Sequence, residues 1–395
     1  MNRYAIHLII TFLFSLIGWT SAKAGDTQTL PTDLKASLIY VSPGYTAYTA
    51  HGHCALRMQC PSQHLDYCFT YGLDDNSQSY MSFFSGKGMG RFSTCYTRDY
   101  LHDYQLHHRQ VSEFELNLSL NEKRNLWALL DSELSGTSLP YDYLRTNCSS
   151  MCAHAVENIL GKETIEYTNL PAALQGTYRD FVLYISRHKP WISFFWNTLL
   201  GAEGELSGSL DDKLSPALLV EAWSNAAIID TVGARRPMFA GNGKIILSGD
   251  DGTHETPFSP ILIFSLLLML IIGFTLAEKK FHLHKAARIV DGVLLTLQTI
   301  VGIFICYMAF ISILPGTSGS WYVIVFNPLP ALLWLTCRRR HWYCHLLLFY
   351  TCVLLLFILL TPVIPQLDFE HALLEAIFAV RCAADWLKCR KNRDS

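Results

Sequence analysis

The stretch SPILIFSLLLMLIIGFTLA, residues 259–277, decides the overall architecture of this chain because it contains no charged side chain. An uninterrupted apolar run of this length can cross a lipid bilayer as a helix. Similar runs follow it, and together they predict an all-α transmembrane domain of about five helices over residues 258–395. The further expected helices are 292–314, 321–336, 346–364 and a weaker one, 372–387, which Glu375, Arg381 and Asp385 interrupt.

The basic residues between these runs predict how the chain is oriented. They cluster after the first, third and fifth runs, whereas the loops 315–320 and 365–371 contain neither lysine nor arginine. Because basic loops remain on the cytoplasmic side, residues 25–257 are expected outside the cytoplasm and the C-terminus inside it. The basic residues are Lys279, Lys280, Lys285, Arg288, Arg338, Arg339, Arg340, Lys388, Arg390, Lys391 and Arg393.

The composition excludes several classes of protein. Of 395 residues, 50% are hydrophobic and 16% are charged, and the formal charge is −2. This balance excludes an isolated cytosolic globular protein and a disordered protein. A charge so near zero also argues against nucleic acid as a partner.

The N-terminus is typical of a secreted or membrane-inserted protein. Residues 1–24 have the features of a signal peptide, with a basic start, an apolar core and the cleavage pattern Ala22-Lys23-Ala24. The alternative is an anchor that is not cleaved. Residues 25–250 are then a periplasmic domain, and residues 251–257 link it to the membrane domain.

Alternating apolar residues and capping patterns predict an outer domain that contains both strands and helices. Ser119 and Glu122 form a capping-box pattern at the start of a helix. Asn147 is expected to cap a second helix, from Cys148 to about residue 160, which Gly161 ends. The expected strands are 36–42, 53–58, 65–71, 110–118 and 244–248.

The sequence YDYLRTNC, residues 141–148, is the strongest chemical signal in the outer domain. A cysteine in the first turn of a capped helix lies where backbone N–H groups and the helix dipole favour negative charge. We therefore expect a lowered thiol pKa at Cys148 and a nucleophile, with free amides available for an oxyanion. The alternative is a small buried residue that begins a helix, and both interpretations remain open at this point.

A nucleophilic cysteine needs a base, and His53 is the best placed of the seven histidines at positions 51, 53, 64, 102, 107, 108 and 154. It follows Gly52 and begins an expected strand, which would hold its ring still. His154 lies too far along the helix of Cys148 to reach back. A zinc site of His51, His53, His107 and His108 is the less favoured alternative, because no carboxylate or cysteine lies at a matching spacing.

Several short motifs follow one another along the outer domain: Gly52-His53, Ala55-Leu56-Arg57, Tyr71-Gly72, Gly86-Lys87 and Asn147-Cys148. This ordered pattern resembles the Lnb-type lipoprotein N-acyltransferases of Bacteroides-like bacteria. The similarity covers most of residues 36–250, and the membrane half agrees in layout, including Asn327-Pro328. It implies an α+β, circularly permuted papain-like domain of the NlpC/P60-like type, in which the histidine precedes the cysteine.

The resemblance also implies catalytic roles. Cys148 is the nucleophile and His53 is its base. Family members often carry an amide in the strand after the histidine, and this chain has Phe69-Thr70-Tyr71-Gly72 instead. Thr70, or Asp66, would then orient His53.

Substrate contacts are expected at three further residues. Lys87 and Arg109 are candidates for binding a phosphate head group, and Tyr71 for contacting the substrate. Arg109 matches the second residue of a Gly-Arg pair in the family, although His108 replaces the glycine. The alternative for both basic residues is a solvated surface charge.

The activity that the resemblance implies is acyl transfer from a membrane phospholipid, through a thioester on Cys148, to the α-amine of a diacylglyceryl-cysteine lipoprotein. We expect a monomer in the bacterial inner membrane, with no cofactor and no metal. One alternative is a membrane-anchored NlpC/P60-type cysteine peptidase or amidase that cleaves cell-wall peptides, although such an enzyme has little need of five spans. A non-catalytic receptor or scaffold is a third possibility.

Overall fold

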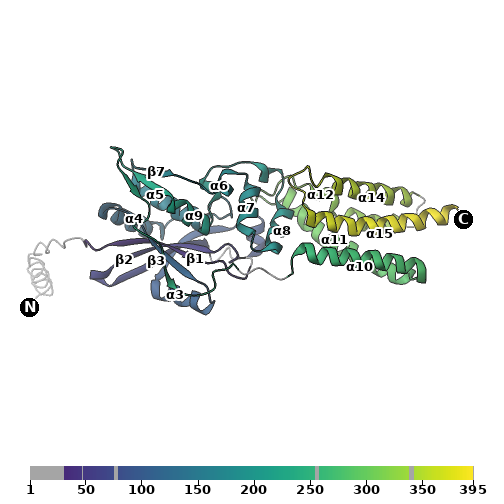
Figure 1. Ribbon diagram of the computed structural model, residues 1–395, viewed down its shortest axis with the longest axis horizontal. Coiled ribbons are helices and arrows are strands. Elements are labelled where there is room, and N and C mark those ends of the chain that lie inside the picture. Colours follow the sequence, from purple (N-terminus) through teal and green to yellow (C-terminus); the bar gives the residue numbers. More distant parts are fainter. Residues whose placement is uncertain (1–30, 47, 75–78, 254–257, 338–341, 395) are drawn as a thin grey trace, which may run out of the picture.

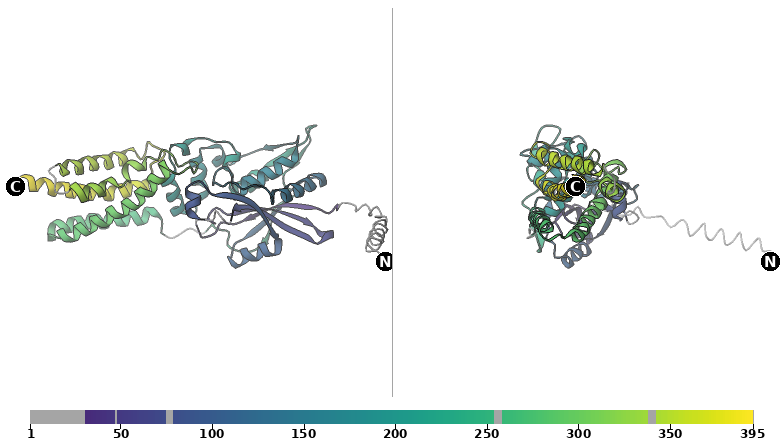
Figure 2. Two further views of the ribbon diagram at one scale, coloured as in Figure 1. Left: turned by 180° about the vertical axis from the view of Figure 1, so that it is seen from behind. Right: turned by 90° about the vertical axis from the view of Figure 1, so that its right-hand side faces the viewer.

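The computed structural model describes residues 31–46, 48–74, 79–253, 258–337 and 342–394. The expected signal peptide, 1–24, and part of the expected linker therefore lie outside the described residues. The molecule is elongated, with a sheet-containing domain at one end and a helical bundle at the other (Figure 1). The same arrangement is seen from behind in Figure 2.

The outer domain is built on a seven-stranded sheet whose strand order is β10-β5-β1-β2-β3-β4-β6. Each neighbouring pair is antiparallel. All five predicted strands are present within a few residues of their expected bounds, whereas β4 and β6 were not predicted. The strands are β1 (Lys35–Val41), β2 (His53–Cys60), β3 (Leu65–Leu73), β4 (Met89–Tyr96), β5 (Val111–Glu115), β6 (Leu139–Pro140) and β10 (Lys244–Leu247).

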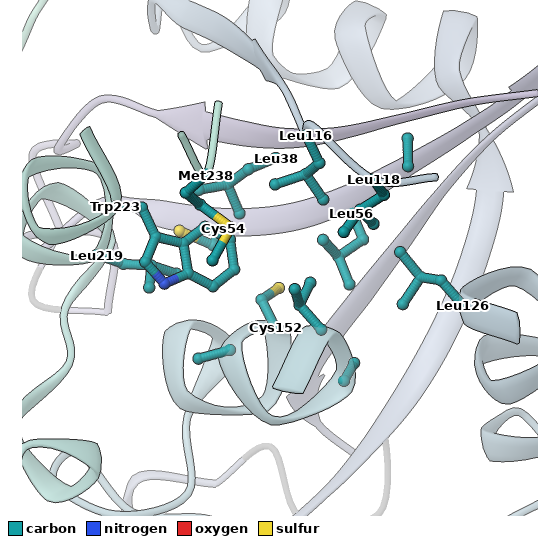
Figure 3. Packing of buried hydrophobic residues seen from close by; sticks show 14 of the residues in the cluster. Leu38, Cys54, Leu56, Leu116, Leu118, Leu126, Cys152, Leu219, Trp223 and Met238 are labelled. Atoms are coloured by element: carbon teal, nitrogen blue, oxygen red, sulfur yellow. The ribbon is translucent and has the colours of Figure 1, made fainter. Parts of the chain in front are cut away.

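Helices cover both faces of this sheet. On one face, α4 (Leu120–Glu133), α5 (Cys148–Leu160) and α9 (Pro216–Ser224) enclose the main core, and on the other lies α3 (Thr97–Leu106). Figure 3 shows Cys54 of β2 and Cys152 of α5 in the main core beside Trp223. The capping box of Ser119 and Glu122 is present at the start of α4, as predicted.

The remaining elements of the outer domain connect the sheet to the bundle. A separate three-stranded sheet has the order β7-β8-β9. Helix α8, from the aromatic stretch near Trp191, lies between the two domains (Figure 1). These elements are α2 (Tyr80–Phe84), α6 (Ala172–Gln175), α7 (Tyr178–Ser186), α8 (Pro190–Leu199), β7 (Thr164–Tyr167), β8 (Ala226–Ile229) and β9 (Arg235–Pro237), with short 3-10 turns at Pro61–Gln63, Ala202–Glu205 and Asp211–Lys213.

The described residues of the membrane domain form helices joined by loops. By length and apolar composition, three of these helices, α10, α11 and α14, are able to span a membrane. The count of about five spans therefore stays a prediction, because α12 and α13 are short and α15 carries charges. The helices are α10 (Pro260–Phe281), α11 (His284–Phe310), α12 (Tyr322–Val325), α13 (Leu329–Cys337), α14 (Tyr343–Leu360) and α15 (Phe369–Asp394).

Two charged side chains inside the bundle differ in their partners: Arg381 is paired with carboxylates, whereas Glu375 lacks a hydrogen-bond partner among the described residues. Arg381 of α15 forms ion pairs with Asp291 of α11 at 2.7 Å and with Glu278 of α10 at 3.0 Å. Glu375 is buried, and neither of its carboxyl oxygens has a hydrogen-bond partner among the described residues. A disulfide joins Cys344 of α14 to Cys389 of α15.

Candidate active site

The start of α5 is fixed by its own capping residues. The Asn147 side chain accepts hydrogen bonds from the backbone N–H groups of Ser149 at 2.9 Å and Ser150 at 3.2 Å. The Ser150 hydroxyl in turn accepts the N–H of Asn147. This reciprocal cap confirms the predicted helix start, and it places Cys148 in the first turn.

The Cys148 thiol lies in a buried environment. Burial raises its pKa, and hydrogen bonds from the backbone N–H groups of Cys54, Ser149 and Cys148 itself lower it by less. The expected lowering of the thiol pKa is therefore wrong. Burial destabilises the thiolate by more than hydrogen bonds from the backbone N–H groups stabilise it. Cys148 is a neutral thiol at pH 7.

His53 is bonded to Thr70, the residue expected to orient it. The His53 Nε2 atom and the Thr70 hydroxyl are 2.5 Å apart. Burial, with a smaller contribution from the positive charge of Arg109, lowers the pKa of His53 to about 4. The imidazole is therefore neutral at pH 7 and able to accept a proton.

His53 is the first residue of β2, and the Cys148 sulfur lies against the same end of that strand. Among the described residues, the two side chains are not hydrogen-bonded to each other. The sulfur of Cys148 accepts a hydrogen bond from the N–H of Cys54, the neighbour of His53. Strand alternation places His53 with Ala55 on the α3 face of the sheet, whereas α5 packs on the other face.

The loop before Cys148 is attached to the membrane domain. The Tyr143 hydroxyl donates a hydrogen bond to the backbone oxygen of Pro315, in the α11–α12 loop, at 2.7 Å. Tyr143 also stacks on Trp196 of α8, with ring centroids 4.3 Å apart. Gly316 follows with a positive φ, and a Cβ atom there would lie 2.9 Å from the Tyr143 hydroxyl. The candidate nucleophile therefore lies five residues from a contact with the bundle.

Two family models match the chain. The Lnb N-terminal periplasmic domain matches residues 21–181, and the Lnb transmembrane domain matches residues 252–392. The chain belongs to the Lnb family. No curated protein and no solved structure matches it.

Membership of the Lnb family, which was predicted from short motifs, has direct consequences. The protein is a membrane protein with a periplasmic N-terminal domain. The family suggests an enzyme with a lipoprotein N-acyltransferase-like function. The family models assign no role to Cys148, His53 or Thr70, which remain candidates on geometry.

The three residues expected to contact substrate in this Lnb-family protein lie in different environments. Lys87 is exposed beside Gly86, whose Cβ, if present, would lie 2.5 Å from the backbone nitrogen of Leu314. Arg109 is buried and donates two hydrogen bonds to the backbone oxygen of Ser42, so its guanidinium is already engaged. Tyr71 is only 1% exposed, which leaves it no surface for a ligand. Only Lys87 keeps a position suited to binding a head group.

Sequence reasoning missed several residues around the site. Tyr143 belongs to the stretch 141–148, but its contact with the bundle had no signal in the local sequence. The backbone of Cys54 was also missed, because an N–H group carries no side-chain signature. In the part of the chain that the structure describes, no group of three or more His, Cys, Asp or Glu residues is arranged to hold a metal ion.

Proposed function

We propose that this Lnb-family protein is a lipoprotein N-acyltransferase that carries its acyl group on Cys148. The observation that carries the proposal is the attachment of the 141–148 loop to the α11–α12 loop through Tyr143 and Pro315. A nucleophile at this junction meets substrates whose reactive groups lie at the membrane surface. A peptidase of the cell wall, the alternative, has no need of such a junction.

The first half-reaction forms a thioester. His53 accepts the proton of the Cys148 thiol, and the sulfur attacks an ester carbonyl of a phospholipid in the periplasmic leaflet. The backbone N–H groups of Cys54 and Cys148, which approach the sulfur, would stabilise the oxyanion, whereas those of Ser149 and Ser150 bond the Asn147 cap. His53 then returns the proton to the leaving alcohol, and a lysophospholipid departs.

The second half-reaction uses the same residues. The α-amine of a diacylglyceryl-cysteine lipoprotein attacks the thioester, and His53 takes a proton from the attacking nitrogen. The carbon–sulfur bond breaks, the thiolate regains a proton, and the product is an amide. Thr70 holds His53 in place through Nε2 during both steps. Lys87 binds the phosphate of the donor, no cofactor or metal takes part, and the enzyme acts as a monomer.

The membrane half holds the enzyme where both substrates are found. We propose five spans in the inner membrane: α10, α11, the α12–α13 pair, α14 and α15. With a periplasmic N-terminal domain, this number places the C-terminus in the cytoplasm, in agreement with the basic tail. The signal peptide 1–24 delivers the domain to the periplasm.

Mass spectrometry of the purified full-length protein tests the proposal. Incubation with phosphatidylethanolamine is expected to add one acyl group at Cys148, and neutral hydroxylamine is expected to remove it because it cleaves thioesters. Cys152→Ser, a matched change one helical turn away on α5, should still form the adduct. An acyl group on any other residue, or none in the native protein, would overturn the assignment of Cys148.

The acceptor is tested in cells that contain no other lipoprotein N-acyltransferase. Expression of the native protein is expected to convert diacylated lipoproteins to the N-acylated form, and expression of Cys148→Ser is not. Normal lipoproteins with altered cell-wall peptides in the variant would favour the peptidase.

A further inference from the structure

The bundle contains a cavity at the end distant from the periplasmic domain. It has a volume of about 280 Å³ and lies between α11, α13, α14 and α15. Its wall is mostly apolar, and typical lining residues are Leu295, Leu333, Leu346, Val353 and Phe378. Because the periplasmic domain lies on the other side of the bundle (Figure 1), the cavity belongs to the cytoplasmic leaflet and not to the leaflet beside Cys148.

The cavity arises from a break between α12 and α13. The Asn327 side chain donates to the backbone oxygens of Val323 and Ile324 and accepts the N–H of Leu329. It therefore satisfies backbone groups on both sides of the break, which would be costly to leave unpaired inside a membrane. Gly302 of α11 allows close approach here, since a Cβ atom would lie 2.8 Å from the Cα of Asn327. The break is thus a built feature of the bundle.

The cavity is apolar towards the middle of the bundle and charged at its cytoplasmic end. Asp291, Arg381 and Asp385 line the charged end. Lys388 forms ion pairs with Asp385 at 3.0 Å and with Glu278 at 2.5 Å. Besides the His284 ring, which lies 3.7 Å from Glu278, three carboxylates, on Glu278, Asp291 and Asp385, are paired with two cations, on Arg381 and Lys388. The excess carboxylate favours a ligand that brings an ammonium group.

We propose that this cavity binds one acyl chain of a cytoplasmic-leaflet glycerophospholipid whose head group carries an ammonium group. The apolar wall takes the chain, since a dry cavity would forfeit dispersion contacts and water would find few partners there. The phosphate lies near Lys388, and the ammonium lies near Asp385. This lipid is separate from the acyl donor, and the inference does not depend on the acyl-transfer chemistry.

Retention of defined lipids by the full-length protein tests this inference. The protein is stripped in detergent, loaded with phosphatidylethanolamine or phosphatidylglycerol, and freed of excess lipid, after which bound lipid is counted by mass spectrometry. Leu295→Trp fills the cavity, and Leu297→Trp is the matched control, because Leu297 is on the same helix but is exposed on its outer face. We expect Leu295→Trp to retain roughly tenfold less phosphatidylethanolamine than Leu297→Trp at equal lipid concentration.

A second variant keeps the test valid if Leu295→Trp fails to fold. Asp385→Asn leaves the cavity open and removes the proposed partner of the ammonium. It is expected to abolish a severalfold preference of the native protein for phosphatidylethanolamine over phosphatidylglycerol. Equal retention by both tryptophan variants would overturn the chain site. A native preference for phosphatidylglycerol, or a preference that Asp385→Asn leaves unchanged, would overturn the proposed head-group contact.

Discussion

Two buried polar groups of this protein, one in each domain, are bonded very differently. In the membrane domain, Arg381 donates to Asp291 through two nitrogens and to Glu278 and Thr275 through the third. In the periplasmic domain, the His53 ring bonds the Thr70 hydroxyl, and within the described ranges the Cys148 thiol meets backbone N–H groups and, at 3.9 Å, the Ser149 hydroxyl. Four hydrogen bonds hold the Arg381 guanidinium, whereas fewer hold the His53 ring and the Cys148 thiol.

This difference separates structural from chemical roles. A buried arginine that bonds two carboxylates holds three helices together, and its removal leaves buried charge without compensation. A neutral thiol and a neutral imidazole cost little to bury and are free to exchange a proton. Substitutions in the first cluster should therefore change stability, and substitutions in the second should change rate.

Replacement of the nucleophile is the largest expected effect. Cys148→Ala should reduce lipoprotein N-acylation by roughly 10⁴-fold or more, since no other group can carry the acyl chain. Cys152→Ala removes a buried thiol from the same helix and should leave the rate within a few-fold of the native protein. The measurement is the rate of appearance of N-acylated lipoprotein in proteoliposomes. Equal losses in both variants would assign Cys148 to packing.

Replacement of the base comes next. His53→Gln should lower the rate by roughly 10³-fold, within the range of general acid–base catalysis. His154→Gln, which alters a histidine on the helix of Cys148, should have little effect. Comparable losses in the two variants would remove His53 from the mechanism.

The pH dependence of the reaction rate in the native protein also tests the role of His53. The imidazole must be neutral to accept a proton, and its pKa is about 4 because of burial and then Arg109. The acid side of the rate profile is therefore expected to have its midpoint near pH 4, with full activity retained through pH 6. A midpoint near 6.5, the usual pKa of histidine, would mean that His53 is solvated in the working enzyme.

Local sequence signals predicted these sites only in part. The cap formed by Asn147 and the placement of Cys148 and His53 at element starts follow from neighbouring residues, so they were predicted correctly. The direction of the thiol pKa shift was not predicted correctly, because it depends on burial by packing against distant strands. Arg109 and Tyr71 were expected at the substrate but lie in the interior for the same reason.

The membrane half shows the same limit. Apolar runs predicted the helices, and Asn327-Pro328 marked the break. The partners of Arg381 come from α10 and α11, far away in the chain, and no local pattern specifies them. The three-stranded sheet β7-β8-β9 was also missed, since its strands have three or four residues each and come from separate parts of the chain.

Substitution of Arg381 should lower the stability of the protein. Arg381→Met removes the cation paired with Asp291 and one of the two paired with Glu278, and it is expected to cost about 3–5 kcal/mol of unfolding free energy. Lys391→Met alters an exposed basic residue on the same helix and should cost less than about 0.5 kcal/mol. Thermal unfolding in detergent measures both. An undiminished melting temperature in Arg381→Met would contradict the structural role of the cluster.

The smallest expected effect, and the sharpest test of the comparison, lies at Thr70. Thr70→Val keeps the shape of the side chain but removes the hydroxyl that His53 Nε2 contacts. If Thr70 positions the ring, N-acylation should fall by roughly tenfold, equivalent to about 1.4 kcal/mol, while the melting temperature changes little. Thr70→Ser restores the hydroxyl and should recover most of the rate.

Whether kcat or KM changes in Thr70→Val distinguishes a role in positioning His53 from a role in packing. A mobile imidazole affects the chemical steps, so kcat should fall in Thr70→Val while KM for the lipoprotein stays near its native value. The acid midpoint of the pH profile should also move, because Nε2 gains a different environment. A rise in KM alone would indicate that Thr70 shapes the substrate site. An unchanged rate would show that His53 is held by packing, and its hydrogen bond to Thr70 would then have no role in catalysis.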